Sequence, residues 1–298
     1  MRTLDDPEIS GQDLSPLFGA QYVNQQLMPT THPGQASWVW RVKTQDGSYI
    51  VRTSRYTEPP DEDFWQGAWR LFKHNPATLQ GMVWADRALG PRSPIRLPKI
   101  WRQELYHGRP YLIVEDMPGV PLHSFNQLSE DGLTEFGAAL ATIHGGDHEA
   151  PTTQPAIPFH ITAAPVMQYL LHRFYHQDPT CQQLWKTLAP RIADLPTEDF
   201  WSPILLDMDP SQFLTDGRQL TAIVDTELYV MAPRHLELIG LEYLMGADVA
   251  ARFRKGYESI RPLPDLTPWR HTYRFLLRLL SFQGPVDWGL WMNHPNRF

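Results

Sequence analysis

A change in hydrophobic periodicity at Met117-Pro118-Gly119 constrains the fold of this chain more than any other feature. Before this tripeptide, bulky and β-branched residues alternate with polar ones in short runs, the pattern of half-buried strands. After it, apolar residues recur every three or four positions, the spacing of amphipathic helices. At about 150 residues per domain, 298 residues suggest two domains or one bilobal unit. We therefore expect an α+β protein with a β-rich first part and a mostly helical second part.

The first part contains a clear hairpin signal. Ser37–Val42 (SWVWRV) and Ser48–Arg52 (SYIVR) carry strand patterns, and a Gln-Asp-Gly turn separates them. Strands are also predicted over 96–103 and 109–115, and a short helix over 63–72. A second helix should begin at Asn75-Pro76, because Asn caps helices and Pro suits the first turn, and it should end at Leu89.

Helical spacing dominates the second part. Helices are predicted over 133–144, 166–175, 182–188, 235–245, 248–260 and 269–282. We interpret His144, at the end of the first of these, as a core or helix-terminal residue rather than a catalytic one. Two short apolar runs, Ile204–Leu206 and Leu220–Val224, flank an unusual polar loop.

Charge and composition exclude several classes of function. The chain has 26 basic and 33 acidic residues, a net charge of −7, so we expect no binding to nucleic acid or to a membrane surface. No apolar run approaches the roughly 20 residues of a membrane helix. The opening MRTLDDPEIS lacks the apolar core of a signal peptide, and a single cysteine excludes an intrachain disulfide. These features predict a cytoplasmic protein.

The polar loop at 204–227 carries the candidate chemistry. Asp207 leaves an apolar run and enters a turn that contains proline, whereas Asp225 ends a β-branched run, so the two acids can converge. The Gln212 amide supplies a third oxygen, and Mg²⁺ binds a few protein oxygens while keeping water and phosphate as its other ligands. A base, an amide ligand and a metal carboxylate are the parts of phosphoryl transfer. The alternative is a hairpin in which these aspartates, with Asp209, only cap turns.

This loop resembles the catalytic region of the aminoglycoside phosphotransferase and choline kinase-like family. That family has H-G-D-x-x-x-x-N, then a hairpin, then I-D-x-E. The resemblance places Asp207 at the catalytic aspartate, Gln212 at the metal-binding asparagine and Asp225 at the metal-binding aspartate. Glu227 repeats the acid two residues on, and Glu237 lies where the family often has an aspartate opening the next helix.

The resemblance extends in order over about residues 20–280. The segment 109–122 (RPYLIVEDMPGVPL) resembles the hinge strand of the family, 136–144 (FGAALATIH) its L-A-x-L-H helix, and 34–52 its nucleotide-covering hairpin. It implies a protein-kinase-like bilobal fold: an N-lobe over 1–114, a hinge over 115–119 and a helical C-lobe over 120–298.

The resemblance also implies cofactors and their contacts. ATP and Mg²⁺ would be bound, and the acceptor would be a hydroxyl on a small molecule. Arg52 stands at the strand lysine that holds the phosphates, and Gly34 is the one glycine of the phosphate-covering turn. The backbone at Glu115 and Met117 would meet adenine. Gln80 is the best positional match to the helix glutamate that pairs with the lysine.

Departures from the family pattern keep alternatives open. Leu205-Leu206 replaces H-G, Gln212 is one methylene longer than asparagine, and Arg52 presents a rigid fork rather than a point charge. These departures favour a catalytically degenerate, pseudokinase-like binding or scaffold protein as the alternative. A further alternative is a fructosamine kinase-like sugar kinase, because the last helix, 269–280, resembles those enzymes.

Overall fold

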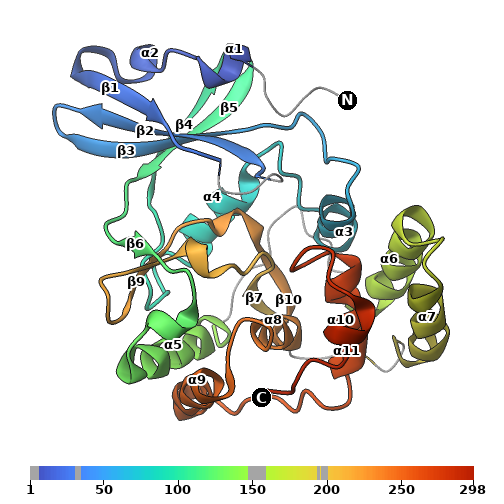
Figure 1. Cartoon of the computed structure of the whole chain (residues 1–298). Helices are drawn as coiled ribbons and strands as arrows, with labels where there is room; N and C mark the ends of the chain where they lie inside the picture. Colours follow the sequence, from blue (N-terminus) through green and yellow to red (C-terminus); the bar gives the residue numbers. More distant parts are fainter. Residues whose placement is uncertain (1–6, 31–34, 147–158, 193–194, 196–200) are drawn as a thin grey trace.

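A five-stranded antiparallel sheet forms the upper part of Figure 1, in the order β1-β2-β3-β5-β4. The structure is a computed structural model that describes residues 7–30, 35–146, 159–192, 195 and 201–298. The strands are β1 Tyr22–Leu27, β2 Ser37–Thr44, β3 Gly47–Ser54, β4 Ile100–Tyr106 and β5 Arg109–Glu115. Two short helices, α1 Pro7–Ser10 and α2 Ser15–Phe18, and the 3-10 turn η1 Gly19–Gln21 precede the sheet.

The predicted hairpin is confirmed as β2 and β3, paired from Ser37↔Ser54 to Thr44↔Gly47. Trp38, Trp40 and Val42 of β2 are buried in one cluster with Val51 of β3. Because successive side chains of a strand point to opposite faces, Arg52 faces away from this cluster. This alternation directs the guanidinium toward the helical half of the molecule.

The helix α3 (Asp63–Phe72) has the predicted bounds, but α4 (Gln80–Ala88) starts later than predicted. The Asn75 side chain accepts a hydrogen bond from the Ala77 N–H (3.0 Å) in a separate turn, and Leu79 has a φ of 55°. A left-handed residue interrupts helical geometry, so the helix begins only after Leu79. Likewise β4 starts at Ile100 rather than at Arg96, because Arg96 forms an isolated bridge to Ala222.

Although α3 lies within the segment predicted as the N-lobe, it packs on the helical half. Trp65, Ala68 and Leu71 belong to the same large core cluster as the C-terminal helices. Gly67 lies so close to Leu280 that an added Cβ would meet the Leu280 side chain at 2.0 Å. Figure 1 shows α3 above α10, apart from the sheet.

The second part of the chain is mostly helical and confirms the predicted α+β order. Its helices are α5 Glu130–Ile143, α6 Phe159–Phe174, α7 Pro179–Ile192, α8 Arg234–Leu241, α9 Ala247–Ile260, α10 Arg270–Leu279 and α11 Trp288–Met292. Small antiparallel pairings join β6 Val120–Pro121, β8 Phe213–Thr215 and β9 Leu220–Ile223, and separately β7 Trp201–Leu205 and β10 Tyr229–Pro233. Three 3-10 turns complete this part: η2 Phe125–Gln127, η3 Pro210–Gln212 and η4 Thr226–Leu228. Within the described residues, no helix has the length and apolar character needed to cross a bilayer.

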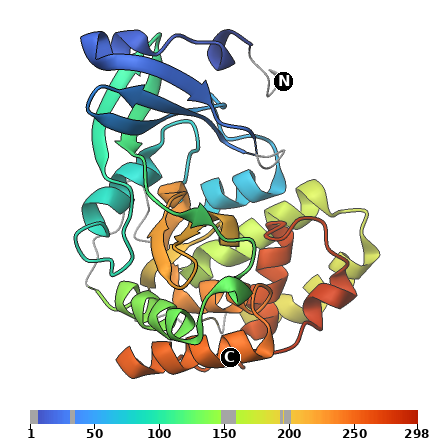
Figure 2. The same ribbon diagram turned by 60° about the vertical axis from the view of Figure 1, so that its left-hand side comes forward.

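The chain passes from the sheet to the helical half through β5 and β6. In Figures 1 and 2 the sheet occupies one end of the molecule and α5 and α9 the opposite end. Gly119, just before β6, has a φ of +127°, and an added Cβ there would meet the Thr221 hydroxyl at 2.8 Å. Only glycine suits this close crossing.

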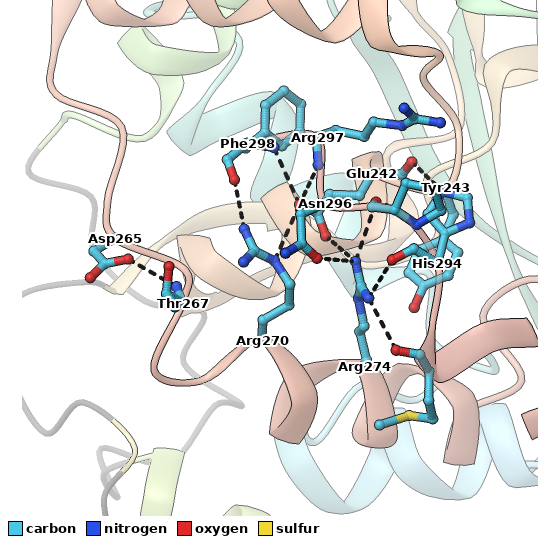
Figure 3. Close-up of polar contacts among 12 residues, drawn as sticks. Glu242, Tyr243, Asp265, Thr267, Arg270, Arg274, His294, Asn296, Arg297 and Phe298 are labelled. Carbon is cyan, nitrogen blue, oxygen red and sulfur yellow. Dashed lines mark hydrogen bonds and ion pairs between the residues drawn. The ribbon is translucent and has the colours of Figure 1, made fainter. Parts of the chain in front are cut away.

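A buried carboxylate, Glu242, anchors residues 292–298 (Figure 3). It accepts the backbone N–H groups of Arg297 and Phe298 and pairs with Arg274 (Nη2 to Oε2, 2.7 Å). Arg274 also donates to the carbonyls of Met292 and His294. These bonds fasten α10 and α11 to the end of α8.

Candidate active site

Asp207 lies two residues after the end of β7, where the chain leaves a paired strand. Leu205 is paired with Tyr229 of β10, and the Leu206 N–H donates to the Leu228 carbonyl at 3.0 Å. The Asp207 side chain is half-buried. Asp209 instead caps the short 3-10 turn at 210–212, accepting from the Ser211 N–H and hydroxyl. The turn-capping interpretation therefore describes Asp209 but not Asp207.

Gln212 lies beside Asp207. Its Nε2 donates to Asp207 Oδ2 at 3.2 Å, whereas its Oε1 is buried and has no hydrogen-bond partner among the described residues. The Gln212 carbonyl accepts the Val224 N–H at 2.9 Å, which places Gln212 next to the end of β9, one residue before Asp225. A buried amide oxygen without a partner is costly unless a further ligand satisfies it.

Arg52 reaches this loop from β3. Its Nη1 lies 2.9 Å from Asp225 Oδ1 and its Nη2 lies 3.6 Å from Glu227 Oε2. Gln80, the predicted partner, is exposed at the start of α4, so this expectation is wrong. The sequence signal that points to the actual partner is the acid two residues after Asp225.

The site is negatively charged and partly shielded from water. Burial, then the charges of Asp225 and Asp209, raise the pKa of Asp207 to about 7. Burial and Asp225 also raise the pKa of Glu227, although Arg52 opposes this shift. Carboxylates that disfavour one another's ionisation favour a bound cation.

These residues could provide some of the oxygen ligands of a magnesium ion. Asp225 supplies a carboxylate that is 37% exposed, and Gln212 supplies the unpartnered amide oxygen. Over the described ranges, no three His, Cys, Asp or Glu side chains are grouped as a metal site. Mg²⁺ commonly takes one or two carboxylates together with water and substrate phosphates, so a small protein set is sufficient.

A buried pair behind the loop holds β7 in place. Glu237, in the first turn of α8, accepts the Leu205 N–H at 2.8 Å through Oε1 and contacts His144 Nε2 at 2.5 Å through Oε2. The other His144 nitrogen lies 2.9 Å from the Tyr257 hydroxyl. His144 is thus a core residue, as predicted, and Glu237 fixes the chain two residues before Asp207.

The remaining predicted contacts lie at the hinge and in the covering turn. Met117 is buried with Leu214 and Ala222, in an apolar cluster between the hinge and the β8–β9 hairpin. Glu115 ends β5, where its carboxylate pairs with Arg96 at 2.5 Å. Gly34 lies outside the described residues. Adenine binding at the backbone of Glu115 and Met117 stays a prediction.

Solved structures with the same arrangement of strands and helices include several small-molecule kinases. The macrolide 2′-phosphotransferase MphH of Brachybacterium faecium superposes with a TM-score of 0.62 at 15% identity, over 96% of this chain and 98% of that chain. A thermostable mutant of aminoglycoside phosphotransferase APH(4)-Ia, in complex with ADP and hygromycin B, gives 0.61 at 13% identity, with 91% and 89% coverage. Choline kinase LicA of Streptococcus pneumoniae gives 0.58 at 16% identity, with 94% and 92% coverage. These likenesses establish the protein-kinase-like fold.

Sequence comparison addresses the family directly. A search of curated proteins gave no match. The sequence profile of the phosphotransferase enzyme family, however, matches residues 30–270, which include β2, β3, the hinge and the whole loop from Asp207 to Glu227. This match spans most of the chain and contains each described site residue, so the chain belongs to the phosphotransferase enzyme family.

Proposed function

We propose that this protein uses ATP and Mg²⁺ to phosphorylate a hydroxyl group of a small molecule. One observation carries the proposal: Gln212 contacts Asp207 through its Nε2, while its buried Oε1 has no partner among the described residues, and its backbone is bonded to Val224, the residue before Asp225. This arrangement would bring a base and two metal ligands together, as phosphoryl transfer requires. The complex of a fold relative with ADP and hygromycin B supports a nucleotide and a small-molecule acceptor.

Each residue has a role that follows from its place. Asp225 and Gln212 would hold Mg²⁺, which supplies charge neutralisation at the phosphates. Arg52 would contact the phosphates with its planar, permanently charged fork. Asp207 would orient the acceptor hydroxyl and take its proton. The reaction would take place in the cytoplasm, without nucleic acid or membrane as partner.

The alternative is a non-catalytic, pseudokinase-like binding protein. It is favoured by the ion pair between Arg52 and Asp225, which occupies both a phosphate ligand and a metal ligand. If this pair does not open, neither side chain is available to a metal–nucleotide complex. Both functions therefore depend on whether nucleotide and Mg²⁺ separate these two side chains.

Thermal unfolding with ATP, with and without Mg²⁺, tests the proposal. Ligand at 100 times its dissociation constant adds about 2.7 kcal/mol to the free energy of unfolding, so ATP with Mg²⁺ should raise the melting temperature. Asp207→Asn should keep this shift and lose phosphate transfer, because the base acts on the acceptor side. No shift with millimolar ATP, GTP or their Mg²⁺ complexes would contradict the proposal.

A further inference from the structure

The two carboxylates that contact Arg52 are placed differently. Asp225 is 37% exposed at the end of a strand, whereas the Glu227 side chain is only 6% exposed. The guanidinium is divided between them, with Nη1 on Asp225 and Nη2 toward Glu227. Its Nε is buried and has no hydrogen-bond partner among the described residues. The buried positive charge of Arg52 is therefore compensated by these two carboxylates.

Glu227 is held in place by groups other than Arg52. The Ser37 hydroxyl of β2 donates to Glu227 Oε2 at 3.4 Å. The backbone of α4 lies directly on the turn at 226–228, because a Cβ added to Gly81 would stand 1.8 Å from the Glu227 carbonyl oxygen. A side chain at position 81 would therefore push the helix away. Contacts with β2 and α4 therefore hold Glu227 in position independently of its contact with Arg52.

Binding of a metal to Asp225 would remove one of the two partners of Arg52. A buried cation that loses its counter-charge is strongly destabilised, so Arg52 needs a second carboxylate that no metal recruits. Glu227 meets this need, because it is buried and already contacts the other nitrogen of the fork.

We infer that Glu227 is the positioning residue of Arg52: it retains Nη2 while Nη1 leaves Asp225 for the nucleotide phosphates. This inference rests on the proposed function and concerns how the same site is organised. The residue that orients Arg52 would then come from the polar loop at 204–227, two residues after Asp225, rather than from helix α4. In the nucleotide-free protein, the single charge of Arg52 is shared between the two acids; in the complex, it would be shared between Glu227 and phosphate.

The test measures the affinity of the full chain for the non-hydrolysable analogue AMP-PNP with Mg²⁺, by calorimetry. Glu227→Gln keeps the size of the side chain but removes its charge, and should weaken binding about tenfold or more, because Arg52 loses its buried counter-charge. Glu227→Asp keeps the charge at shorter reach and should give an intermediate affinity. Glu258→Gln, the same change in an exposed pair with Arg254, is the matched control and should bind like wild type.

A double-mutant cycle separates positioning from general damage to the fold. In an Arg52→Met background, Glu227→Gln should cause no further loss of AMP-PNP affinity, because there is no guanidinium left to position. An equal loss in both backgrounds, or wild-type affinity in Glu227→Gln, would overturn the inference. If Glu227→Gln does not fold, Glu227→Asp decides, since unchanged affinity in that variant would also overturn it. Absence of binding by the wild-type chain would instead overturn the proposed function, and the inference with it.

Discussion

Arg52 and Asp225 form an ion pair, with Nη1 and Oδ1 2.9 Å apart, between a strand of the sheet and the loop of the helical half. The two residues are 173 positions apart in the chain, and the guanidinium is almost fully buried while the carboxylate is partly exposed. The pair joins the side chain expected to bind phosphate to the one expected to bind metal. Under the proposed function, nucleotide binding would require this pair to open.

Replacing Asp225 with asparagine should weaken binding of the metal–nucleotide complex. The change removes the charge of a metal ligand, so the Mg²⁺ concentration that gives half-maximal nucleotide binding should rise by about tenfold or more. Calorimetry with AMP-PNP over a Mg²⁺ series measures this. Asp216→Asn, in the exposed turn at 216–219, is the control, and identical Mg²⁺ dependence of the two variants would contradict the assignment of Asp225.

Replacing Gln212 with asparagine should improve use of Mg²⁺. The extra CH₂ of glutamine moves the amide oxygen by roughly 1.5 Å, and Mg²⁺ requires near-octahedral ligands at about 2.0–2.1 Å. We expect Gln212→Asn to lower the Mg²⁺ concentration needed for activity. Mn²⁺ also suits oxygen ligands, so replacing Mg²⁺ with Mn²⁺ should raise the activity of the wild-type chain more than that of the variant. A higher Mg²⁺ requirement in the variant would show that the longer side chain is the fitted one.

Replacing Glu237 with glutamine should destabilise the catalytic loop. The glutamine can still accept the Leu205 N–H, but the buried pair with His144 is lost. Leaving a buried polar group without its hydrogen-bond partner costs about 1–3 kcal/mol, which chemical denaturation would measure. Glu104→Gln, on the exposed edge strand, should change the free energy of unfolding by less than about 0.5 kcal/mol. Equal stability of both variants would exclude a structural role for the Glu237 charge.

The contribution that two buried histidines, His235 and His74, make to the free energy of unfolding should fall when the protein is acidified from pH 7 to pH 5, whereas Asp207 and Glu227, whose pKa is raised, contribute in the opposite direction. Burial lowers the pKa of His235 to about 4, and burial does the same for His74. Between pH 6.5 and pH 4 these two histidines therefore bind more protons in the unfolded chain than in the folded chain, so their contribution to stability rises with pH in this window. Each such histidine contributes on the order of 2 kcal/mol between pH 5 and pH 7.

His235→Phe isolates one of these contributions, because phenylalanine can keep the stacking on Tyr273 but does not titrate. Its unfolding free energy should depend less on pH than that of the wild type. His123→Phe, at an exposed position, should leave the pH dependence unchanged. If the unfolding free energy of His235→Phe changed with pH as steeply as that of the wild type, His235 would not be a source of the pH dependence.

Replacing Arg274 with methionine should release residues 292–298. The change removes donors to the carbonyls of Met292 and His294 and leaves Glu242 without its nearest cation. We expect a loss of about 3–5 kcal/mol in unfolding free energy and faster proteolysis in this segment. Arg254→Met, in an exposed pair with Glu258, should cost less than about 1 kcal/mol. Equal stability of the two variants would show that the buried anchor contributes nothing.

Local patterns in the sequence determined much of this protein. The β2–β3 hairpin, helix α3 and the order of strands and helices follow from periodicity and turn residues, which act over a few positions. The placement of Asp207, Gln212 and Asp225 in one loop follows from spacing and family resemblance, and the structure places Gln212 against Asp207.

Only the tertiary structure decided which distant groups meet. It pairs Arg52 with Glu227 instead of Gln80, docks α3 on the helical half and delays α4 until after Leu79. A charge inside a protein takes its partner from whichever carboxylate the packing brings within reach, and a helix packs wherever its apolar face can be buried. Both depend on contacts between segments far apart in the chain, and local sequence patterns do not encode that information.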